Sequence, residues 1–294
     1  MRLPRREDVL IGSHGEQLAA YFYRPDADGP VPCVVMAHGF SATRDDGLPA
    51  YAEAFADAGF AVVLFDYRHF GRSTGEPRQL LDIGRQQDDY RAVIQWARQR
   101  EDIDANRIAL WGSSFSGGHV IAVAAGDPRI AAVISQAPFT DSVSAIAAMP
   151  LRNILRAGVA AVRDQVGALL GRSPRYLPAV GAPGTFAAMT APEALPGFEA
   201  IAGPESLWRN EIAARVVLHL SFYRPVRMAS RLVMPILFCV CDDDATTPPA
   251  SSIEAARRAP HGELIRYPYG HFAIYLDPQV KADQVDFLRR VLGG

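Results

Sequence analysis

The sequence predicts an α/β protein with a doubly wound, mostly parallel sheet and an inserted helical cap. Apolar runs alternate with helical patterns from residue 31 to about 140, and the alternation resumes at residue 235. Strands and helices that alternate in this way form a parallel sheet with helices on both faces. Residues 141–231 break the rhythm and are too long for an ordinary connecting loop.

The size and composition fit one large core domain that carries this insertion. Hydrophobic residues make up 49% of the 294 residues and charged residues 21%, which is enough to bury a substantial core. We expect residues 1–140 and 232–294 to form the α/β core. Residues 141–231 are expected to form the cap.

Charge and apolar content exclude several classes of partner. The 30 basic and 32 acidic residues leave a net charge of −2, and no basic stripe predicts nucleic-acid binding. No apolar run approaches the roughly 20 residues that cross a bilayer, and the first residues lack an apolar signal core. Cys33, Cys239 and Cys241 lie in apolar runs without disulfide or zinc spacing. We expect a cytoplasmic protein without metal, cofactor, membrane or nucleic-acid partner, and homo-oligomerisation stays open.

The first third of the chain predicts a hairpin followed by two buried strands. Residues 8–23 contain two strand patterns around a turn. Residues 31–37 and 61–65 are continuous apolar runs, typical of strands covered on both faces. Apolar residues at helical spacing predict helices over residues 51–58 and about 80–100.

The motif at the centre of the chain is a strand, a sharp turn and a helix, with a serine at the turn. Residues 108–111 are apolar, residues 112–117 read Gly-Ser-Ser-Phe-Ser-Gly, and a helical pattern begins at about residue 120. This order predicts a nucleophile elbow with Ser114 at its tip. A serine on such a turn has a strained backbone, and the residues two places to either side must be small because strand and helix nearly touch. Gly112 and Ser116 are small, although glycine is usual at the second position; the alternative is an ordinary Gly/Ser turn.

The remaining core elements lie on both sides of the insertion. Strands are predicted over residues 130–134, 235–241 and 263–267, and helices over residues 253–258 and 280–292. Ligands of such sheets bind at the carboxyl ends of the strands. Those ends bring His38, Asp66, Ser114 and Phe139 to one rim.

The insertion opens with a strongly periodic helix. Its apolar residues recur at helical spacing, and arginines lie on the other face. The apolar set is Leu151, Ile154, Leu155, Val159, Val162, Val166 and Leu169, and the arginines are Arg152, Arg156 and Arg163. A proline-rich stretch follows, and a second helix is predicted over about residues 205–220. We expect a cap over the rim, and the alternative is a helical domain without a role at the site.

Ser114 needs a base to remove its proton, and the base needs a third group to orient it. His271 follows the last strand on the same rim as Ser114, and Gly270 lets the backbone bend there. Other histidines lie in the hairpin, the elbow helix, the insertion or before a strand, namely His14, His119, His219 and His261. We therefore expect His271 to be the base.

The acid is expected between the serine and the histidine in the chain. Asp242, Asp243 and Asp244 end the penultimate strand at the right place. We prefer Asp244, which stands four residues before Pro248 in a turn that could direct the carboxylate across the rim. Asp242 and Asp243 are local alternatives, Asp141 is a more distant one, and a solvated acidic turn is the plain interpretation.

An oxyanion hole requires two backbone N–H donors. The amide of Phe115, directly after the nucleophile, is the first. The second is expected in the loop after the first parallel strand, where Phe40 follows His38 and Gly39. We expect His38 to order this loop by hydrogen bonding.

These motifs, taken in order, resemble the α/β-hydrolase superfamily. The likeness covers about residues 8–140 and 232–294 and depends on Gly112-x-Ser114-x-Ser116, His38-Gly39, Asp244 to Pro248 and Gly270-His271. Residues 66–73 resemble the Asp-x-Arg-Gly-x-Gly-x-Ser loop of the superfamily, with His69 in place of the first glycine. Residues 40–42, 66–70, 111–118 and 270–272 are similar to the dienelactone-hydrolase-like and X-Pro-dipeptidyl-peptidase-like branch. The resemblance implies the fold and hydrolysis of an acyl bond, and it implies no substrate.

The predicted function is cleavage of an acyl bond of the carboxylic ester type through an acyl-enzyme. Ser114 attacks, His271 carries the proton and Asp244 holds the imidazolium. The apolar cap suggests a small, uncharged and partly hydrophobic acyl substrate, with expected contacts at His38, Tyr67, His69, Met149, Phe222 and Tyr223. The alternatives are a thioesterase or acyltransferase, a carbon–carbon bond hydrolase, an X-Pro peptidase and a non-catalytic ligand-binding protein.

Overall fold

The computed structural model describes residues 5–147 and 151–293 and contains an eight-stranded sheet. The strand order is β1-β2-β4-β3-β5-β6-β9-β10, in which all pairs from β4 to β10 are parallel. The strands are β1 (Arg5–Ser13), β2 (Glu16–Arg24), β3 (Val31–Ala37), β4 (Ala61–Phe65), β5 (Ile103–Ser113), β6 (Ala132–Gln136), β9 (Ile236–Cys241) and β10 (Gly262–Tyr267). The predicted fold class is confirmed, with the hairpin β1–β2 joined antiparallel to β4.

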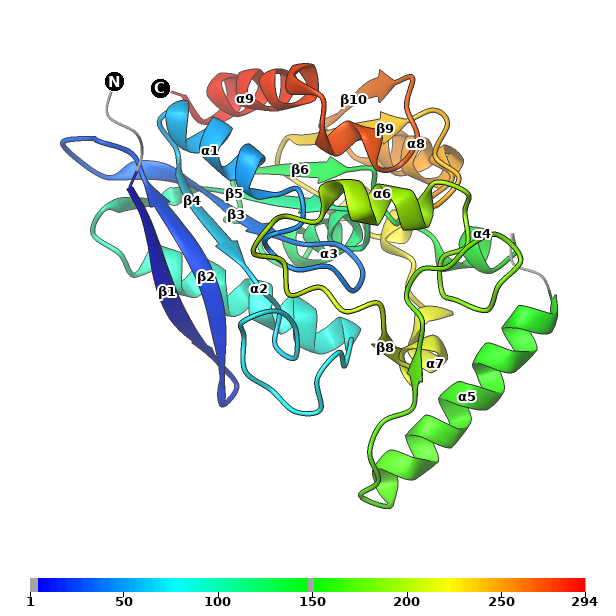
Figure 1. The fold of residues 1–294 in the computed structure, drawn as a ribbon. Coiled ribbons are helices and arrows are strands. Elements are labelled where there is room, and N and C mark those ends of the chain that lie inside the picture. The colour runs from blue at the N-terminus through cyan, green and yellow to red at the C-terminus, as the bar shows by residue number, and fades with distance from the viewer. Residues whose placement is uncertain (1–4, 148–150, 294) are drawn as a thin grey trace.

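Helices cover both faces of this sheet, as the apolar runs in the strands require. One face packs against α1 (Pro49–Asp57) and α9 (Pro278–Leu292), which lie above the sheet in Figure 1. The other face packs against α2 (Ile83–Arg98), α3 (Phe115–Ala124) and α8 (Pro249–Arg258). The core strands are therefore buried between two apolar layers.

Two elements begin at other residues than the sequence predicts, one because of strand pairing and one because of a helix cap. Strand β5 begins at Ile103, five residues before the predicted strand, because Ile103 pairs with Val31 ahead of a register shift. Helix α2 begins at Ile83 because Asp82 caps it by accepting a hydrogen bond from the backbone N–H of Arg85.

The segment 141–231 contains short elements and one long helix. They are α4 (Ser142–Ala147), α5 (Leu151–Leu169), β7 (Tyr176–Leu177), α6 (Ala194–Ile201), β8 (Ile212–Ala213), α7 (Val216–Leu220) and the 3₁₀ turns Pro225–Arg227 and Ala229–Arg231. The helix predicted over about residues 205–220 is wrong except for α7. In place of a helix, Ile212 and Ala213 pair with β7, and the Asn210 side chain bonds both the N–H and the C=O of Val180.

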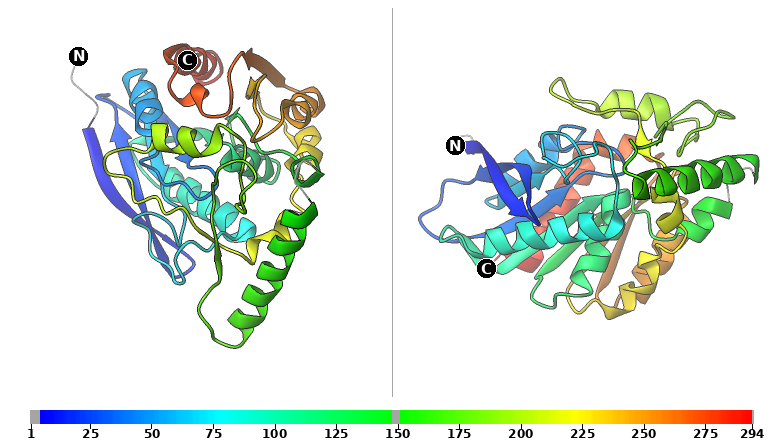
Figure 2. Two further views of the ribbon diagram at one scale, coloured as in Figure 1. Left: turned by 45° about the vertical axis from the view of Figure 1, so that its right-hand side comes forward. Right: turned by 90° about the horizontal axis from the view of Figure 1, so that it is seen from below.

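Helix α5 has the predicted bounds, and its arginines as well as most of its periodic apolar residues are exposed. Figures 1 and 2 show it (green) along the outer edge of the molecule. Its apolar side chains face solvent, and the side packed against the body carries Asn153, Ala157, Ala161 and Asp164. Within the described part of the chain, none of the helices combines the length and apolar content that spanning a bilayer requires.

Candidate active site

Ser114 lies at the junction of β5 and α3 with the strained backbone that a nucleophile elbow requires. Its φ is 57° and its ψ is −119°. A side chain on Gly112 would come within 2.3 Å of the Ser116 carbonyl oxygen, so only glycine fits at that position. The requirement for small residues around the serine therefore has a direct steric cause.

Ser116, the departure from the usual glycine, is accommodated by two tyrosines. Its hydroxyl lies 2.9 Å from the Tyr67 hydroxyl and 2.8 Å from the Tyr90 hydroxyl, and the Tyr90 hydroxyl also donates to the Trp111 carbonyl. All three side chains are buried. The additional hydroxyl of Ser116 is thus fully hydrogen bonded beneath the elbow.

The structure brings Ser114, His271 and Asp244 together from three separate strand ends. His271 Nε2 lies 3.0 Å from Ser114 Oγ, and His271 Nδ1 lies 2.7 Å from Asp244 Oδ2. Asp244 and His271 are each at least 95% buried. With Nδ1–H donating to Asp244, Nε2 is free to accept the proton of the Ser114 hydroxyl.

The charges around His271 favour its protonated form. Burial acts to lower the pKa of His271, but the charge and hydrogen bond of Asp244, together with the charge of Glu193, raise this pKa above its ordinary value. An imidazolium formed as Ser114 loses its proton is therefore stabilised at this position.

The Asp244 carboxylate is fixed by the residues that follow it. Oδ1 accepts from the backbone N–H groups of Thr246 and Thr247 at 2.9 and 2.6 Å. The Thr247 hydroxyl lies 2.8 Å from Asp244 Oδ2 and 3.2 Å from His271 Nδ1. Thr247 is a site residue that the sequence analysis missed, because a threonine in a turn carries no pattern of its own.

The alternative acids point elsewhere. Asp242 is exposed and paired with Arg266 at 2.7 Å, and Asp243 is exposed. Asp141 accepts two hydrogen bonds from Arg224, at 2.9 and 2.7 Å. Asp244 is the member of this set that the structure joins to His271.

Glu193, which the sequence analysis also missed, joins the two loops that carry Asp244 and His271. One carboxylate oxygen accepts from the Ala245 N–H at 3.1 Å and from the Thr246 hydroxyl at 3.4 Å. The other accepts from the His271 N–H at 3.1 Å. Glu193 directly precedes α6, so a residue of the segment 141–231 holds the acid loop and the base loop at a fixed separation.

The two residues expected to form the oxyanion hole lie beside Ser114. Phe115 begins α3, so its N–H is one of the first-turn donors without an acceptor in the helix. A side chain on Gly39 would lie 3.1 Å from the Ser114 Cβ, so glycine lets the chain before Phe40 approach the serine closely. The rings of Phe40 and Phe115 pack edge to face, 5.7 Å apart.

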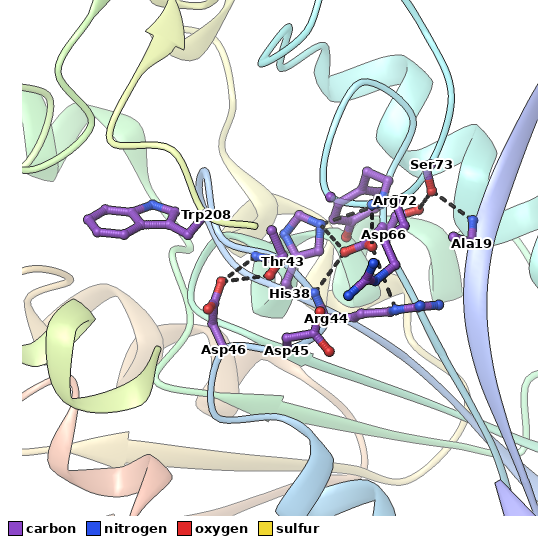
Figure 3. Close-up of polar contacts among 12 residues, drawn as sticks. Ala19, His38, Thr43, Arg44, Asp45, Asp46, Asp66, Arg72, Ser73 and Trp208 are labelled. Atoms are coloured by element: carbon purple, nitrogen blue, oxygen red, sulfur yellow. Dashed lines mark hydrogen bonds and ion pairs between the residues drawn. The ribbon is translucent and has the colours of Figure 1, made fainter. Parts of the chain in front are cut away.

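A buried carboxylate holds the Phe40 loop in place. Figure 3 shows Asp66, at the end of β4, accepting from the backbone N–H of Arg44 at 2.8 Å and from that of Arg72 at 3.0 Å. The Ser73 hydroxyl donates to the Asp66 carbonyl. Burial raises the pKa of Asp66 to about 6, against the effect of the Arg44 charge. Asp66 therefore ties the loop after β3 to the loop after β4.

His38 orders the same region and stays neutral. Its Nδ1–H donates to the Gly39 carbonyl at 3.0 Å, and its Nε2 accepts from the Tyr67 N–H at 3.3 Å. Burial lowers the pKa of His38 to about 4. This arrangement matches the expectation that His38 orders the loop.

Ser114 is among the lining residues of two cavities. The larger has a volume of about 310 Å³, and the smaller has about 10 Å³. The larger is lined by Phe40, Ser114, Phe115, Phe139, Ile146, Ala188, Met189, Thr190, Ala191, Pro192, Leu220, Ala245, Thr246, Thr247 and Pro248. Almost half of this lining belongs to residues 141–231. The smaller cavity reaches both Ser114 and His271.

Of the expected substrate contacts that the structure describes, namely His38, Tyr67, His69, Phe222 and Tyr223, none is among the residues that line the larger cavity. Tyr67 is buried against Ser116, and the His69 ring is buried against Gly75. The Tyr223 hydroxyl bonds His119 Nδ1 at 2.6 Å beneath Phe115, while its neighbour Phe222 is 84% exposed. Met149 lies outside the described residues.

Within residues 5–147 and 151–293, histidine, cysteine, aspartate and glutamate form no group of three or more that could hold a metal ion.

Comparison with known proteins identifies the family. A model of the X-Pro dipeptidyl-peptidase (S15) family matches residues 14–169, just over half of the chain. The chain belongs to the S15 family. This S15 protein is therefore an enzyme of the α/β-hydrolase type, and the resemblance inferred from its motifs is confirmed.

Relatives of this S15 protein extend along nearly its whole length. The quorum-quenching protein AidA of Acinetobacter baumannii (strain MDR-ZJ06) is 44% identical over 97% of this chain and 95% of its own. Thiohydrolase aneE of Aspergillus aculeatus is 32% identical over 72% of this chain and 67% of its own. The crystal structure of the α/β-hydrolase GrgF from Penicillium sp. sh18 has a TM-score of 0.86 and 24% identity, covering 99% of this chain and 100% of that one.

Proposed function

We propose that this chain is a serine hydrolase that cleaves an acyl bond of the carboxylic ester type through an acyl-enzyme on Ser114. The observation that carries the proposal is the pair of hydrogen bonds from Ser114 to His271 and from His271 to Asp244, at 3.0 and 2.7 Å. This is the geometry in which a histidine can act as general base toward a serine hydroxyl.

The reaction proceeds in two halves. Ser114 Oγ attacks the carbonyl carbon while His271 Nε2 takes its proton, and the imidazolium then gives that proton to the departing alkoxide. Water attacks the acyl-enzyme, His271 takes a proton from it, and Ser114 leaves with that proton as the acid is released. The amides of Phe40 and Phe115 stabilise the oxyanion in both halves.

The cavities support hydrolysis of an apolar acyl group. Among the described residues that line the larger cavity no side chain is charged, and Phe139, Ile146 and Leu220 supply apolar surface for an acyl chain. A volume of about 10 Å³ beside His271 has room for about one water molecule. Residues 141–231 then act as a cap that contributes almost half of the residues lining the acyl-binding cavity.

Relatives support acyl chemistry and suggest a second candidate. One is named thiohydrolase aneE and another polyketide transferase grgF of Penicillium sp., which is 31% identical over 69% of this chain. Cleavage of a thioester, or transfer of the acyl group to an alcohol or amine, would use the same acyl-enzyme. The relative named quorum-quenching protein AidA supports a quorum-sensing signal molecule as the substrate, and acyl-bond cleavage requires that this molecule carry an acyl group.

An X-Pro peptidase activity is less well supported than ester cleavage. A dipeptidyl peptidase must bind a free amino terminus, which requires a negative or strongly polar partner in the cavity. The larger cavity offers only neutral side chains, with Thr190, Thr246 and Thr247 as polar groups beside Ser114. Ligand binding without catalysis predicts no turnover of any ester or thioester, and carbon–carbon bond hydrolysis predicts turnover of a 1,3-diketone.

The proposal is tested with p-nitrophenyl esters of increasing chain length, the matching thioesters and an aryl fluorophosphonate. We expect ester turnover and a single covalent adduct in the wild type, and neither in Ser114→Ala. Ser113→Ala, which changes the adjacent serine, is the matched control and should keep both. Turnover by Ser114→Ala at the wild-type rate would refute the proposal, and labelling without ester turnover, with transfer to an added alcohol, would select the transferase.

A further inference from the structure

Helix α5 presents most of its large apolar side chains to solvent and a side of small and polar residues to the protein. Six apolar side chains along it are about half exposed or more: Leu151, Leu155, Val159, Val162, Val166 and Leu169. A helix that packs on a core normally shows the reverse distribution. The exposed side therefore requires an explanation beyond the fold of a single chain.

The orientation of α5 is fixed by specific contacts on its inner side. Asp164 accepts from Arg215 Nε at 2.8 Å and Nη2 at 3.1 Å, and from the backbone N–H groups of Arg215 and Arg175. The Asn153 amide donates to the Thr185 carbonyl. Rotation of the helix to bury its leucines would break these bonds, so the exposed apolar side is a built feature of the structure.

The exposed residues follow the spacing of a two-stranded coiled coil. From Leu155 the steps to Val159, Val162, Val166 and Leu169 are four, three, four and three residues, which is the a/d pattern of a heptad. In this register Val159 and Val166 occupy position a, and Leu155, Val162 and Leu169 occupy position d. We call these five residues the α5 seam. Valine at both a positions with leucine at two of the three d positions favours a pair of helices.

The remaining heptad positions fit a pair of identical chains. The inner residues Asn153, Ala157, Ala161 and Asp164 fall at positions b, f, c and f, opposite the seam. Each protein body therefore lies behind its own α5 and leaves the seam accessible to a second copy. The seam is narrow and lacks aromatic side chains, whereas a helix that lies on a membrane typically has a broad apolar face with tryptophan or phenylalanine.

Charges at the edges of the seam select the relative direction of the two helices. Arg156 and Arg163 occupy position e, and Gly158 and Gln165 occupy position g. In a parallel pair, e of one helix lies beside g of the other, so each arginine meets a neutral residue. In an antiparallel pair the two arginine edges would meet and repel each other.

We propose that this chain forms a two-fold symmetric dimer in which the α5 seams of two copies pair as a parallel coiled coil. A two-fold interface uses the same patch on both subunits, and the α5 seam is complementary to itself. The interface lies apart from the Ser114–His271–Asp244 geometry, so it does not depend on the proposed catalytic function.

Sedimentation equilibrium of the full chain across the micromolar range tests the dimer. We expect twice the monomer mass of 31.9 kDa for the wild type and a monomer for Val162→Asp, whose side chain is already 53% exposed. Val233→Asp, at a similarly exposed valine outside α5, should remain dimeric. A monomeric wild type, or a dimer unaffected by Val162→Asp, would overturn the proposal.

Two cysteine variants test the direction of the helices. In a parallel pair Leu155 faces Leu155 of the second copy, so Leu155→Cys should form a disulfide-linked dimer under mild oxidation. In an antiparallel pair position a of one helix faces position d of the other, so residue 155 would face residue 166. Crosslinking only between Leu155→Cys and Val166→Cys chains in a mixture, or flotation of the wild type but not Val162→Asp with phosphatidylserine vesicles, would contradict the parallel dimer.

Discussion

The carboxylate of Glu193 accepts a hydrogen bond from the backbone N–H of His271 at 3.1 Å while its other oxygen binds the Ala245 N–H. Glu193 thus connects the inserted segment to both loops that carry the proposed base and acid. It touches neither Ser114 nor the cavity beside it, so its role is to position other groups.

Glu193→Gln should change both the rate and its pH dependence. The charge of Glu193 contributes to the raised pKa of His271, so its loss lowers that pKa and moves the acidic limb of the kcat/KM profile to lower pH. One loop contact also weakens, and we expect kcat to fall by between about 10- and 100-fold. Steady-state rates between pH 5 and 8 measure both effects.

Glu199→Gln is the matched control for this change. Glu199 lies on the same helix, α6, and is exposed, so its profile should equal that of the wild type. If Glu193→Gln has the same acidic limb and the same kcat as Glu199→Gln, the contacts of Glu193 with the acid and base loops have no catalytic consequence.

Ser116→Ala should lower stability and leave turnover intact. The Tyr67 hydroxyl loses its partner in a buried site, which costs about 1–3 kcal/mol of the free energy of unfolding. The double variant Ser116→Ala/Tyr67→Phe removes both groups and should recover most of that loss. Urea denaturation measures the free energy of unfolding of the wild type and both variants. A double variant no more stable than Ser116→Ala would show that the loss does not come from the unpaired Tyr67 hydroxyl.

Acyl chain length should control kcat/KM until the larger cavity is full. Each buried methylene contributes about 0.8 kcal/mol, so we expect a rise of about fourfold per methylene over a p-nitrophenyl ester series. Ala188→Leu fills part of the cavity wall and should shift the optimum to shorter chains. Ala182→Leu, at an exposed position of the same segment, should not, and an unchanged optimum in Ala188→Leu would remove this cavity as the acyl site.

His119 should make the protein less stable in acid. Burial lowers the pKa of His119 to about 3, whereas an unfolded histidine titrates near 6.5, so between these values the unfolded state binds more protons. Stability therefore falls with decreasing pH, by about 1.4 kcal/mol per pH unit from this residue well below pH 6.5. His119→Gln should flatten the dependence between pH 4 and 6, and the exposed control His261→Gln should not. Parallel slopes for His119→Gln and the wild type would contradict this assignment.

The core of the fold could be predicted from the sequence because the patterns that indicate its strands are local. Continuous apolar runs such as residues 31–37 and 61–65 became β3 and β4 with the predicted bounds. Parallel strands then bring their carboxyl ends to one edge, which is why Ser114 and His271 meet although 157 residues separate them.

The structure of the inserted segment was harder to predict because the residues that make its contacts follow no periodic pattern in the sequence. Glu193 lies in a proline-rich stretch where a single carboxylate has no distinguishing pattern. Phe222 and Tyr223 were both expected at the substrate, but neighbours in a turn point in different directions, so burial of Tyr223 leaves Phe222 in solvent. Helix α5 was predicted from the spacing of its apolar residues, and this spacing does not reveal which side of the helix faces the protein.

The central claim is that Ser114 forms a covalent acyl-enzyme with His271 as its base. Rapid acid quench of the enzyme with a p-nitrophenyl ester, followed by peptide mass mapping, tests it most directly. We predict an acyl group on the peptide that contains Ser114, absent from Ser114→Ala and strongly reduced in His271→Ala. An acyl group on another residue, or hydrolysis at the wild-type rate by Ser114→Ala, would contradict the claim.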